Sequence, residues 1–330
     1  MPPASDPRHD PSLEIRIPIS PTRGFYHQVR FFEHNLRRLG GIYERALLRV
    51  VVGDDADMAA VRRDNAWSAG RPVDWTGVPR DIFARHGMWG TADWRLMLPP
   101  ETDLVVLADA DTVWLRDIDP LRHAIGPGAV VAGHMAHGPP PMPRDAGVLA
   151  RTRRHALWPV ILQLFDLPMP DRLHPYSMDV EGAFGLAPAY FNLGFVVLTA
   201  EAMRACGRRV PPVQDRLLEV CRSRMRCQIA LTLACLIEGV TQEVLPAEYN
   251  AANDPVHAAH NGVSPDAVRV LHYLRTRELQ RDRILLPEHR AETLALEGGH
   301  PLDRLLLERV AEFLGSVATG DGGRPPPGAG

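Results

Sequence analysis

The sequence predicts a single Rossmann-like α/β domain with a mixed, mostly parallel central sheet flanked by helices. Apolar residues alternate as in a strand over 15–19 and recur at helical spacing over 25–39. A strand-like run follows at 46–52, so the chain opens as strand, helix, strand. The run 104–108 has no polar alternation, as is typical of a strand buried on both faces. This succession predicts parallel strands joined by helical crossovers.

The later elements follow in chain order. We expect an irregular connection over 65–94, a short helix at 121–125, strands at 129–133 and 190–198, a long helix at 214–237 and a last strand at 268–271. His134 and His137 precede a Pro-rich segment that offers no helix to place them on one face. We therefore interpret this stretch as a solvated loop.

No linker or internal repeat divides residues 13–316, so we expect one domain. Residues 1–12 and 317–330 are rich in Pro or Gly and are expected to be disordered tails. Apolar residues share one helical face over 301–316, which predicts an amphipathic C-terminal helix docked on the domain. Peripheral association with a membrane surface and a role as a dimer helix are the alternatives for this helix.

Composition narrows the classes of function and location. The net charge of -3 argues against a nucleic-acid partner, because affinity for nucleic acid depends on clustered positive charge. All 37 basic residues are Arg, which excludes mechanisms that need a lysine amine. The four cysteines form no Cys-x-x-Cys pair, and no apolar run is long enough to span a membrane. With no leader-like N-terminus, these features predict a cytoplasmic protein.

Asp109 and Asp111 directly follow the buried run at 104–108 and are the main candidates for chemistry. In open α/β sheets, ligands bind at the carboxyl ends of the strands. Two carboxylates this close repel each other unless a cation lies between them, and their oxygens suit Mg²⁺ or Mn²⁺. His272 ends another predicted strand. The alternative is an acidic turn with no function, since Asp tolerates turn geometry.

Five short stretches occur in an order and at separations that fit a known family. They are Trp94-Arg95-Leu96, Leu107-Ala108-Asp109-Ala110-Asp111-Thr112, Tyr190-Phe191-Asn192-Leu193-Gly194, Leu245-Pro246-Ala247-Glu248-Tyr249-Asn250 and Val270-Leu271-His272-Tyr273. Together they resemble the nucleotide-sugar glycosyltransferases of the GT-A fold, closest to glycosyltransferase family 8, the glycogenin-like group. The resemblance implies transfer of a hexose from a nucleotide-diphosphate sugar, expected to be UDP-linked, to an acceptor that the sequence does not identify.

The resemblance also implies roles for individual residues. The triplet of Asp109, Ala110 and Asp111 would bind Mn²⁺ or Mg²⁺ together with the diphosphate and ribose of the donor, and His272 would complete the metal shell. Further donor contacts are expected from Ser20 at the nucleotide, Arg95 before the acidic strand, Asn192 and Gly194 at the sugar, and Arg275 at the diphosphate.

The chain departs from the family at two places. Family members carry an Asp-Gln pair where this chain has Cys227-Gln228, and a Gly and a Lys after the metal-binding His where this chain has Tyr273 to Arg277. The family implies retention of anomeric configuration, with Gln228 near the reacting face and Asn192 in the sugar pocket. If Asp179 or Glu181 acts as a base beneath the anomeric carbon, the enzyme would invert instead.

Two other functions stay open. The residues from Asp109 to Val113 also fit the triplet of haloacid-dehalogenase-like phosphatases, in which Asp109 would be the nucleophile that accepts a phosphoryl group. The second is a catalytically silent nucleotide-sugar-binding protein on the same fold, because the Asp beside Gln228 is missing. Turnover with binding intact distinguishes an enzyme from the silent binder.

Overall fold

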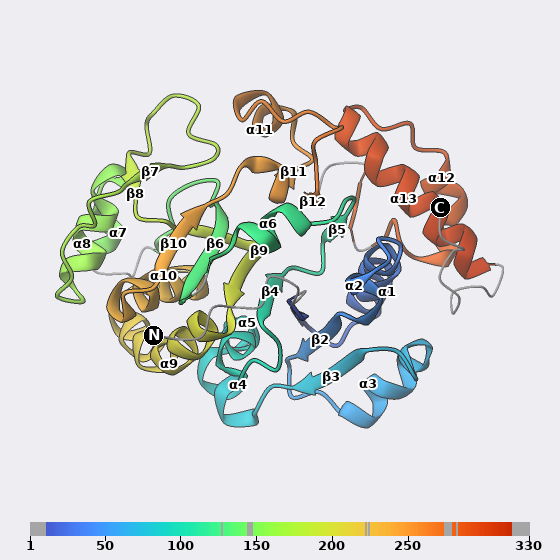
Figure 1. Ribbon diagram of the computed structural model, residues 1–330, viewed down its shortest axis with the longest axis horizontal. Coiled ribbons are helices and arrows are strands. Elements are labelled where there is room, and N and C mark those ends of the chain that lie inside the picture. The colour runs from blue at the N-terminus through green and yellow to red at the C-terminus, as the bar shows by residue number, and fades with distance from the viewer. Residues whose placement is uncertain are drawn as a thin grey trace.

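The computed structural model describes residues 11–126, 128–143, 148–221, 223, 225–273, 279–281 and 283–318. A seven-stranded central sheet has the strand order β10-β6-β9-β4-β1-β2-β3 (Figure 1). Its strands are β1 (Leu13–Ile19), β2 (Leu47–Val52), β3 (Val73–Gly77), β4 (Leu104–Ala108), β6 (Val130–Met135), β9 (Phe191–Thr199) and β10 (Thr241–Val244). Neighbouring strands are parallel, except that β9 is antiparallel to both β4 and β6. The sheet is therefore mixed and mostly parallel, as predicted.

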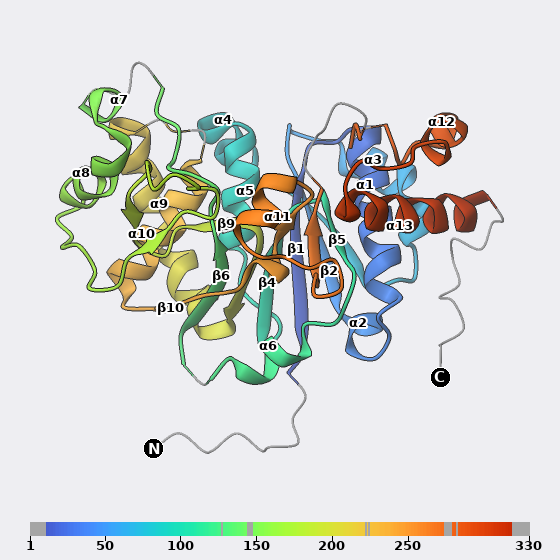
Figure 2. The ribbon, with the colours of Figure 1, turned by 90° about the horizontal axis from the view of Figure 1, so that it is seen from above.

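Helices cover both faces of this sheet (Figure 2). The helices that precede β10 are α1 (Arg23–Arg37), α2 (Ile42–Arg45), α3 (Met58–Asp64), α4 (Arg80–His86), α5 (Met88–Met97), α6 (Asp119–Ala124), α7 (Val148–Arg151), α8 (Leu157–Gln163), α9 (Ala200–Val220) and α10 (Arg226–Glu238). On β4, Val105 and Leu107 belong to the core that α9 and α10 close, whereas Val106 belongs to the core on the α1 side. Burial on both faces explains why the run at 104–108 has no polar alternation.

The last part of the chain adds smaller elements beside the sheet. They are β11 (Ala251–Ala252), α11 (Pro255–His260), β12 (Val270–His272), α12 (Arg290–Leu294) and α13 (Pro301–Ala318). β12 pairs with β11 and, antiparallel, with β5 (Thr112–Trp114). A further pair joins β7 (His174–Pro175) to β8 (Leu186–Ala187).

Helix α13 docks on the domain. Its apolar residues are buried, and the Phe313 ring lies 5.4 Å from the ring of Phe31 on α1. The helix continues through residues 317 and 318, which we had assigned to the tail. Residues 1–10 and 319–330, which make up most of the two predicted tails, lie outside the described residues. Within the described ranges, no helix is long and apolar enough to cross a membrane.

Three predicted elements differ from the structure. The connection at 65–94 contains β3, α4 and most of α5, which are too short to show a clear period and are held by their packing. The helix predicted over 214–237 is two helices, because α9 ends at Val220 and α10 begins at Arg226. The predicted solvated loop at His134 is also wrong, because β6 runs through Met135 and His134 is buried.

A buried ion pair connects β1 to α5. Glu14 and Arg16 are fully buried, and Arg16 Nε donates to Glu14 Oε1 at 2.8 Å. The Arg16 guanidinium also donates to the carbonyl oxygens of Arg95, Leu98 and Pro99, at 2.7, 2.6 and 2.9 Å. These carbonyls lie at the end of α5, where intrahelical partners are missing. β1 therefore fixes the last turn of α5, which carries Arg95.

Replacing Asp93 with Asn is expected to remove a pH dependence of stability. Asp93 on α5 is fully buried and accepts a hydrogen bond of 2.7 Å from Gln214 on α9. Burial raises the pKa of Asp93 from 3.8 to about 7, although Arg226 lowers it. The folded state therefore keeps a proton that the unfolded state loses, and this stabilisation disappears as the pH rises through 7.

Urea unfolding at about pH 5 and about pH 8 checks this expectation. From the lower to the higher of these two pH values, the free energy of unfolding should fall by roughly 3 kcal/mol more in the unaltered protein than in Asp93→Asn. Asp81→Asn, at an exposed position on α4, is the control and should behave like the unaltered protein. Equal pH slopes for Asp93→Asn and the unaltered protein would contradict the raised pKa.

Candidate active site

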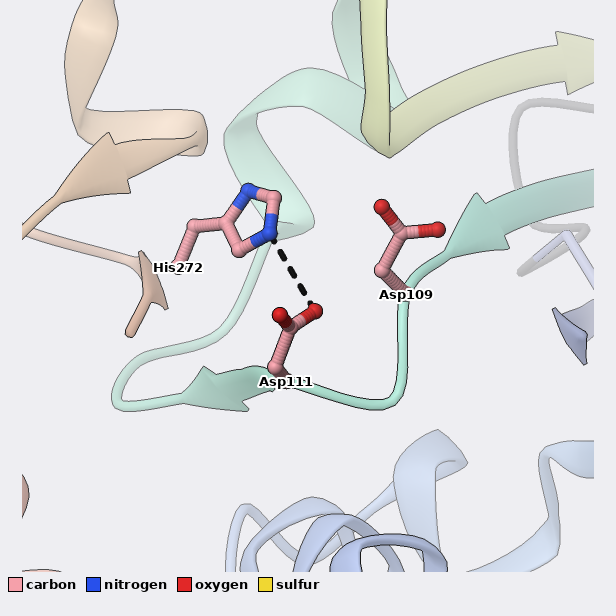
Figure 3. Close-up of side chains that lie close together, drawn as sticks. All are labelled: Asp109, Asp111 and His272. Carbon is pink, nitrogen blue, oxygen red and sulfur yellow. Dashed lines mark ion pairs between the residues drawn. The ribbon is translucent and has the colours of Figure 1, made fainter. Parts of the chain in front are cut away.

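The acidic pair lies at the carboxyl end of β4, in the turn that leads into β5. The backbone N–H of Thr112 donates to the carbonyl oxygen of Asp109 at 3.2 Å, and the Thr112 hydroxyl donates to the same oxygen at 2.9 Å. This closes a tight turn that directs both carboxylates to one side (Figure 3). The Asp109 side chain is 35% exposed and that of Asp111 is 9% exposed. One carboxylate is therefore open to a ligand while the other is enclosed.

His272 faces the acidic pair because β12 pairs with β5. His272 lies opposite Thr112 in this pairing, and its Nε2 is 3.2 Å from Asp111 Oδ1 (Figure 3). The other ring nitrogen, Nδ1, lies 3.2 Å from Asn250 Oδ1. An amide oxygen at Nδ1 accepts a hydrogen bond from the ring, and this leaves Nε2 free to act as a ligand. Asn250 therefore orients His272, a role that sequence reasoning did not assign to it.

Arg95 connects the acidic strand to β9. Its buried guanidinium donates to the carbonyl oxygen of Ala108 at 2.7 Å and to that of Leu193 at 3.5 Å. The same group lies 3.4 Å from Asp109 Oδ1. Arg95 therefore offsets the charge of Asp109 and holds the ends of two neighbouring strands together.

Arg281 pairs with the second carboxylate, Asp111, through its Nη1. Its side chain is 38% exposed, so it can exchange this partner for another anion. Sequence reasoning assigned the diphosphate contact to Arg275, which lies outside the described residues. Arg281 was missed because it lies nine positions beyond His272, with no spacing to mark it.

Opposite charges determine how the buried pair of Asp111 and His272 titrates. Burial alone would raise the pKa of Asp111, but the His272 imidazole and Arg281 hold it below its ordinary value. Burial alone would lower the pKa of His272, but Asp111 and then Asp109 raise it. The structure therefore favours an ionised Asp111 beside a protonated His272. A metal ion at Nε2 would displace this proton, since a ligating imidazole is neutral.

A cavity of about 440 Å³ opens above these residues. Its wall includes eight of the predicted site residues, namely Ser20, Arg95, Asp109, Ala110, Asp111, Asn192, Gln228 and His272. Residues that sequence reasoning did not assign to a site also line it, among them Trp89, His137 and Arg281. The cavity therefore brings together segments of the chain from residue 18 to residue 281.

Asp179 and Glu181 are not part of this wall. Both carboxylate oxygens of Asp179 accept a hydrogen bond from the backbone N–H of Phe184, at 3.1 and 3.0 Å. Glu181 is exposed. Among the described residues that line the cavity, the only carboxylates are Asp109 and Asp111. The structure therefore does not bring Asp179 or Glu181 together with the other predicted site residues.

The donor set fits a divalent cation. One ligand atom from each of Asp109, Asp111 and His272 lies within 4.8 Å of the others. This is the only such group found in the described ranges. Two carboxylates and one imidazole suit Mn²⁺ or Mg²⁺ and leave positions open for oxygen atoms of a substrate.

Gly194 leaves the space that His272 occupies. A Cβ atom at this position would lie 2.6 Å from Cε1 and Nδ1 of His272 and 3.0 Å from Asn192 Oδ1. Gly194→Ala is therefore expected to displace the imidazole and to weaken Mn²⁺ binding by about 10-fold or more, as loss of ligand orientation does. Titration calorimetry with Mn²⁺ measures this. Gly299→Ala, where nothing lies within 4 Å of an added Cβ, should bind as the unaltered protein does. Equal affinities for all three proteins would contradict the tight fit.

Solved structures similar to this chain are glycosyltransferases. The bifunctional glycosyltransferase WbbM matches over 93% of this chain and 51% of its own, at 15% identity and a TM-score of 0.54. The galactosyltransferase LgtC, solved with donor and acceptor sugar analogues, matches over 92% of this chain and 96% of its own, at 16% identity and a TM-score of 0.51. The glycosyltransferase GlyE from Streptococcus pneumoniae TIGR4 matches over 96% of this chain and 65% of its own, at 11% identity and a TM-score of 0.51.

These likenesses concern the fold. This chain spans about half the length of WbbM and less than two thirds of GlyE, but nearly all of LgtC. No protein-family model matches the sequence, and neither does any curated protein. The predicted architecture is confirmed: the chain has the GT-A fold of these glycosyltransferases.

Proposed function

We propose that this protein is a metal-dependent glycosyltransferase that moves a hexose from a nucleotide-diphosphate sugar, UDP-linked, to an acceptor. The observation that carries the proposal is the group of Asp109, Asp111 and His272 at the wall of a cavity of about 440 Å³. Its support is the place of this group, at the end of a buried strand in a fold shared with glycosyltransferases. Solved enzymes with this fold are described as acting on sugars.

The charges around the cavity suit a nucleotide-diphosphate leaving group. A divalent ion bound by Asp109, Asp111 and His272 would supply positive charge for the diphosphate as the glycosidic bond breaks. Arg281 is free to move from Asp111 to a phosphate oxygen once a cation replaces it at the carboxylate. Its guanidinium stays charged at any working pH. Arg95 keeps its carbonyl partners and positions Asp109 throughout.

Retention of configuration is the stereochemical part of the proposal. An inverting reaction needs a base on the face opposite the leaving group. The two candidates for that base, Asp179 and Glu181, do not line the cavity. Gln228, in the first turn of α10, does line it, which supports the contact with the sugar that we propose for this residue. The neighbouring Cys227 does not replace the missing carboxylate, because burial raises the pKa of its thiol to about 12.

The alternative as a phosphatase has less support. A haloacid-dehalogenase-like nucleophile needs a cationic partner for the phosphoryl group, and the chain contains no Lys. An Arg can occasionally take this role, but Arg95 is committed to two backbone carbonyls, and the later Arg281 pairs with Asp111 instead of with Asp109. β1, β2 and β3 precede the acidic strand, whereas that family places its triplet after the first strand. The silent nucleotide-sugar binder differs from our proposal only in turnover.

A cytoplasmic location is part of the proposal. Its support is that all four cysteines are free thiols and are buried, as suits a reducing compartment. The sulfur atoms of Cys206 and Cys235 lie 3.7 Å apart. A secreted protein in which a disulfide joins these two cysteines would contradict a cytoplasmic location.

Nucleotide release from a panel of nucleotide sugars, with and without Mn²⁺, tests the proposal. We expect Mn²⁺-dependent release from at least one UDP-sugar and a loss of about 100-fold or more in Asp111→Asn, because the enclosed carboxylate holds the ion. Thermal unfolding of this variant without metal is measured as well, because Asp111 also pairs with His272 and Arg281 and its loss can lower stability. Phosphate release from simple phosphomonoesters would favour the phosphatase, and binding of a nucleotide sugar without turnover would favour the silent binder. The anomer of the released sugar, observed by NMR at early times, reports retention or inversion.

Arg281→Ala is expected to separate metal binding from donor binding. Removing the guanidinium leaves Asp111 without this competing cation, so Mn²⁺ affinity without nucleotide should stay equal or rise. The affinity for UDP should fall by about 10-fold, as for loss of one charge-assisted hydrogen bond. Arg283→Ala, at an exposed position, is the control. A parallel loss of Mn²⁺ and UDP binding would contradict the exchange of partners.

A further inference from the structure

Three histidines lie close together, and one of them lines the cavity. His134 lies on β6, His137 follows two residues after β6, and His257 lies on α11. The ring centroid of His257 is 5.7 Å from that of His134 and 5.2 Å from that of His137. We call these residues the histidine cluster. His137 lines the cavity, whereas His134 and His257 are buried behind it.

The histidine cluster is neutral. His134 Nδ1 lies 3.0 Å from the carbonyl oxygen of Leu245, to which it donates. His134 Nε2 and both nitrogens of His257 are buried, and within the described part of the chain they have no hydrogen-bond partner. Burial and, to a lesser extent, the neighbouring imidazoles lower the pKa of His137 to about 3 and that of His257 to about 4. A neutral imidazole has one nitrogen that donates and one that accepts a hydrogen bond.

The histidine cluster is not arranged around one ion. Among the described residues, only Asp109, Asp111 and His272 bring three ligand atoms within 4.8 Å of one another. A neutral imidazole of the cluster suits a group that both donates and accepts hydrogen bonds. A hydroxyl group does both, and it does not require a charged partner.

The order of the strands places His137 at the sugar end of the cavity. Ser20 follows β1, Asp109 follows β4, Asn192 lies at the start of β9, and His137 follows β6. These strands are consecutive in the sheet, in the order β6-β9-β4-β1. Given the proposed function, the ion at the end of β4 holds the diphosphate, which joins the nucleotide to the sugar. With the nucleotide toward Ser20, the sugar extends toward Asn192 and His137.

We propose that the imidazole of His137 binds a sugar hydroxyl group in the cavity. The inference rests on the proposed function and deepens it, because it assigns a specificity-determining residue to the sugar side of the site. The hydroxyl belongs either to the transferred hexose or to a sugar acceptor, and both offer the same chemistry. The ring of His257 lies beside that of His137, with the two ring centroids 5.2 Å apart.

The test compares His137→Leu and His137→Asn with the unaltered protein in the presence of Mn²⁺. Leu removes the hydrogen bonds, while Asn keeps a donor and an acceptor. The first measurement is the affinity for the best UDP-sugar of the panel and for UDP alone. The second is nucleotide release with water as the acceptor and with added methyl glycosides of the common hexoses. His123→Leu, at an exposed position on α6, is the control.

Two results support the inference. If His137 binds the transferred hexose, His137→Leu weakens UDP-sugar binding by about 3- to 10-fold and leaves UDP binding unchanged. If His137 binds the acceptor, the affinities for the UDP-sugar and for UDP stay unchanged, and so does nucleotide release with water as the acceptor. The stimulation of nucleotide release by a methyl glycoside then falls by a similar factor. In either case His137→Asn restores part of the loss.

Other results overturn the inference. An equal loss of UDP-sugar and UDP binding would place His137 at the nucleotide or the ion instead of the sugar. If His137→Leu changes neither the affinity for the UDP-sugar nor the stimulation of nucleotide release by a methyl glycoside, His137 only fills space. If no methyl glycoside stimulates the unaltered protein, the affinities for the UDP-sugar and for UDP alone decide. If the unaltered protein binds no nucleotide sugar, the proposed function fails, and this inference fails with it. Failure confined to the His137 variants leaves the proposed function intact.

Discussion

The guanidinium of Arg95 holds the end of β4 against the start of β9, and the geometry of the candidate site depends on this contact. It donates to carbonyl oxygens on both strands and lies beside Asp109. The end of α5, the helix that carries Arg95, is fixed by Arg16 on β1, which donates to three carbonyl oxygens there. Two buried cations therefore connect β1, α5, β4 and β9. A buried charge is stable only when it is neutralised and hydrogen-bonded, so these contacts leave little freedom to move.

The contacts of Arg16 and Arg95 show one use of arginine in a chain that contains no lysine. Arg16 bonds at once to a carboxylate and to carbonyls from three residues, which requires several donors in a planar arrangement. A lysine ammonium has three donors on a single atom and is more strongly hydrated, so it would be a poorer fit in a dry strand-to-helix contact. Positive charge in this chain thus serves the architecture as well as the site.

The sequence predicted those parts of the fold and the site that follow a recognisable local pattern. The buried strand, Asp109 and Asp111 at its end and His272 on a later strand are visible in the pattern, and the structure brings them together. Glu14 and Arg16 were not predicted to be buried, because strand alternation cannot reveal a helix that covers the polar face. Asn250, Arg281 and His137 act through contacts between segments more than 20 residues apart, which no local pattern encodes.

The reversed direction of β9 has a consequence for the register in which this strand can pair. Parallel strands present their final residues to the cavity, whereas β9 presents its first ones, including Asn192 and Gly194. A slide of β9 by one residue against β4 would exchange the two faces of β9 and put a side chain where His272 now lies beside Gly194. The fit of Gly194 against His272 therefore fixes the register of β9 in addition to the hydrogen bonds between the strands.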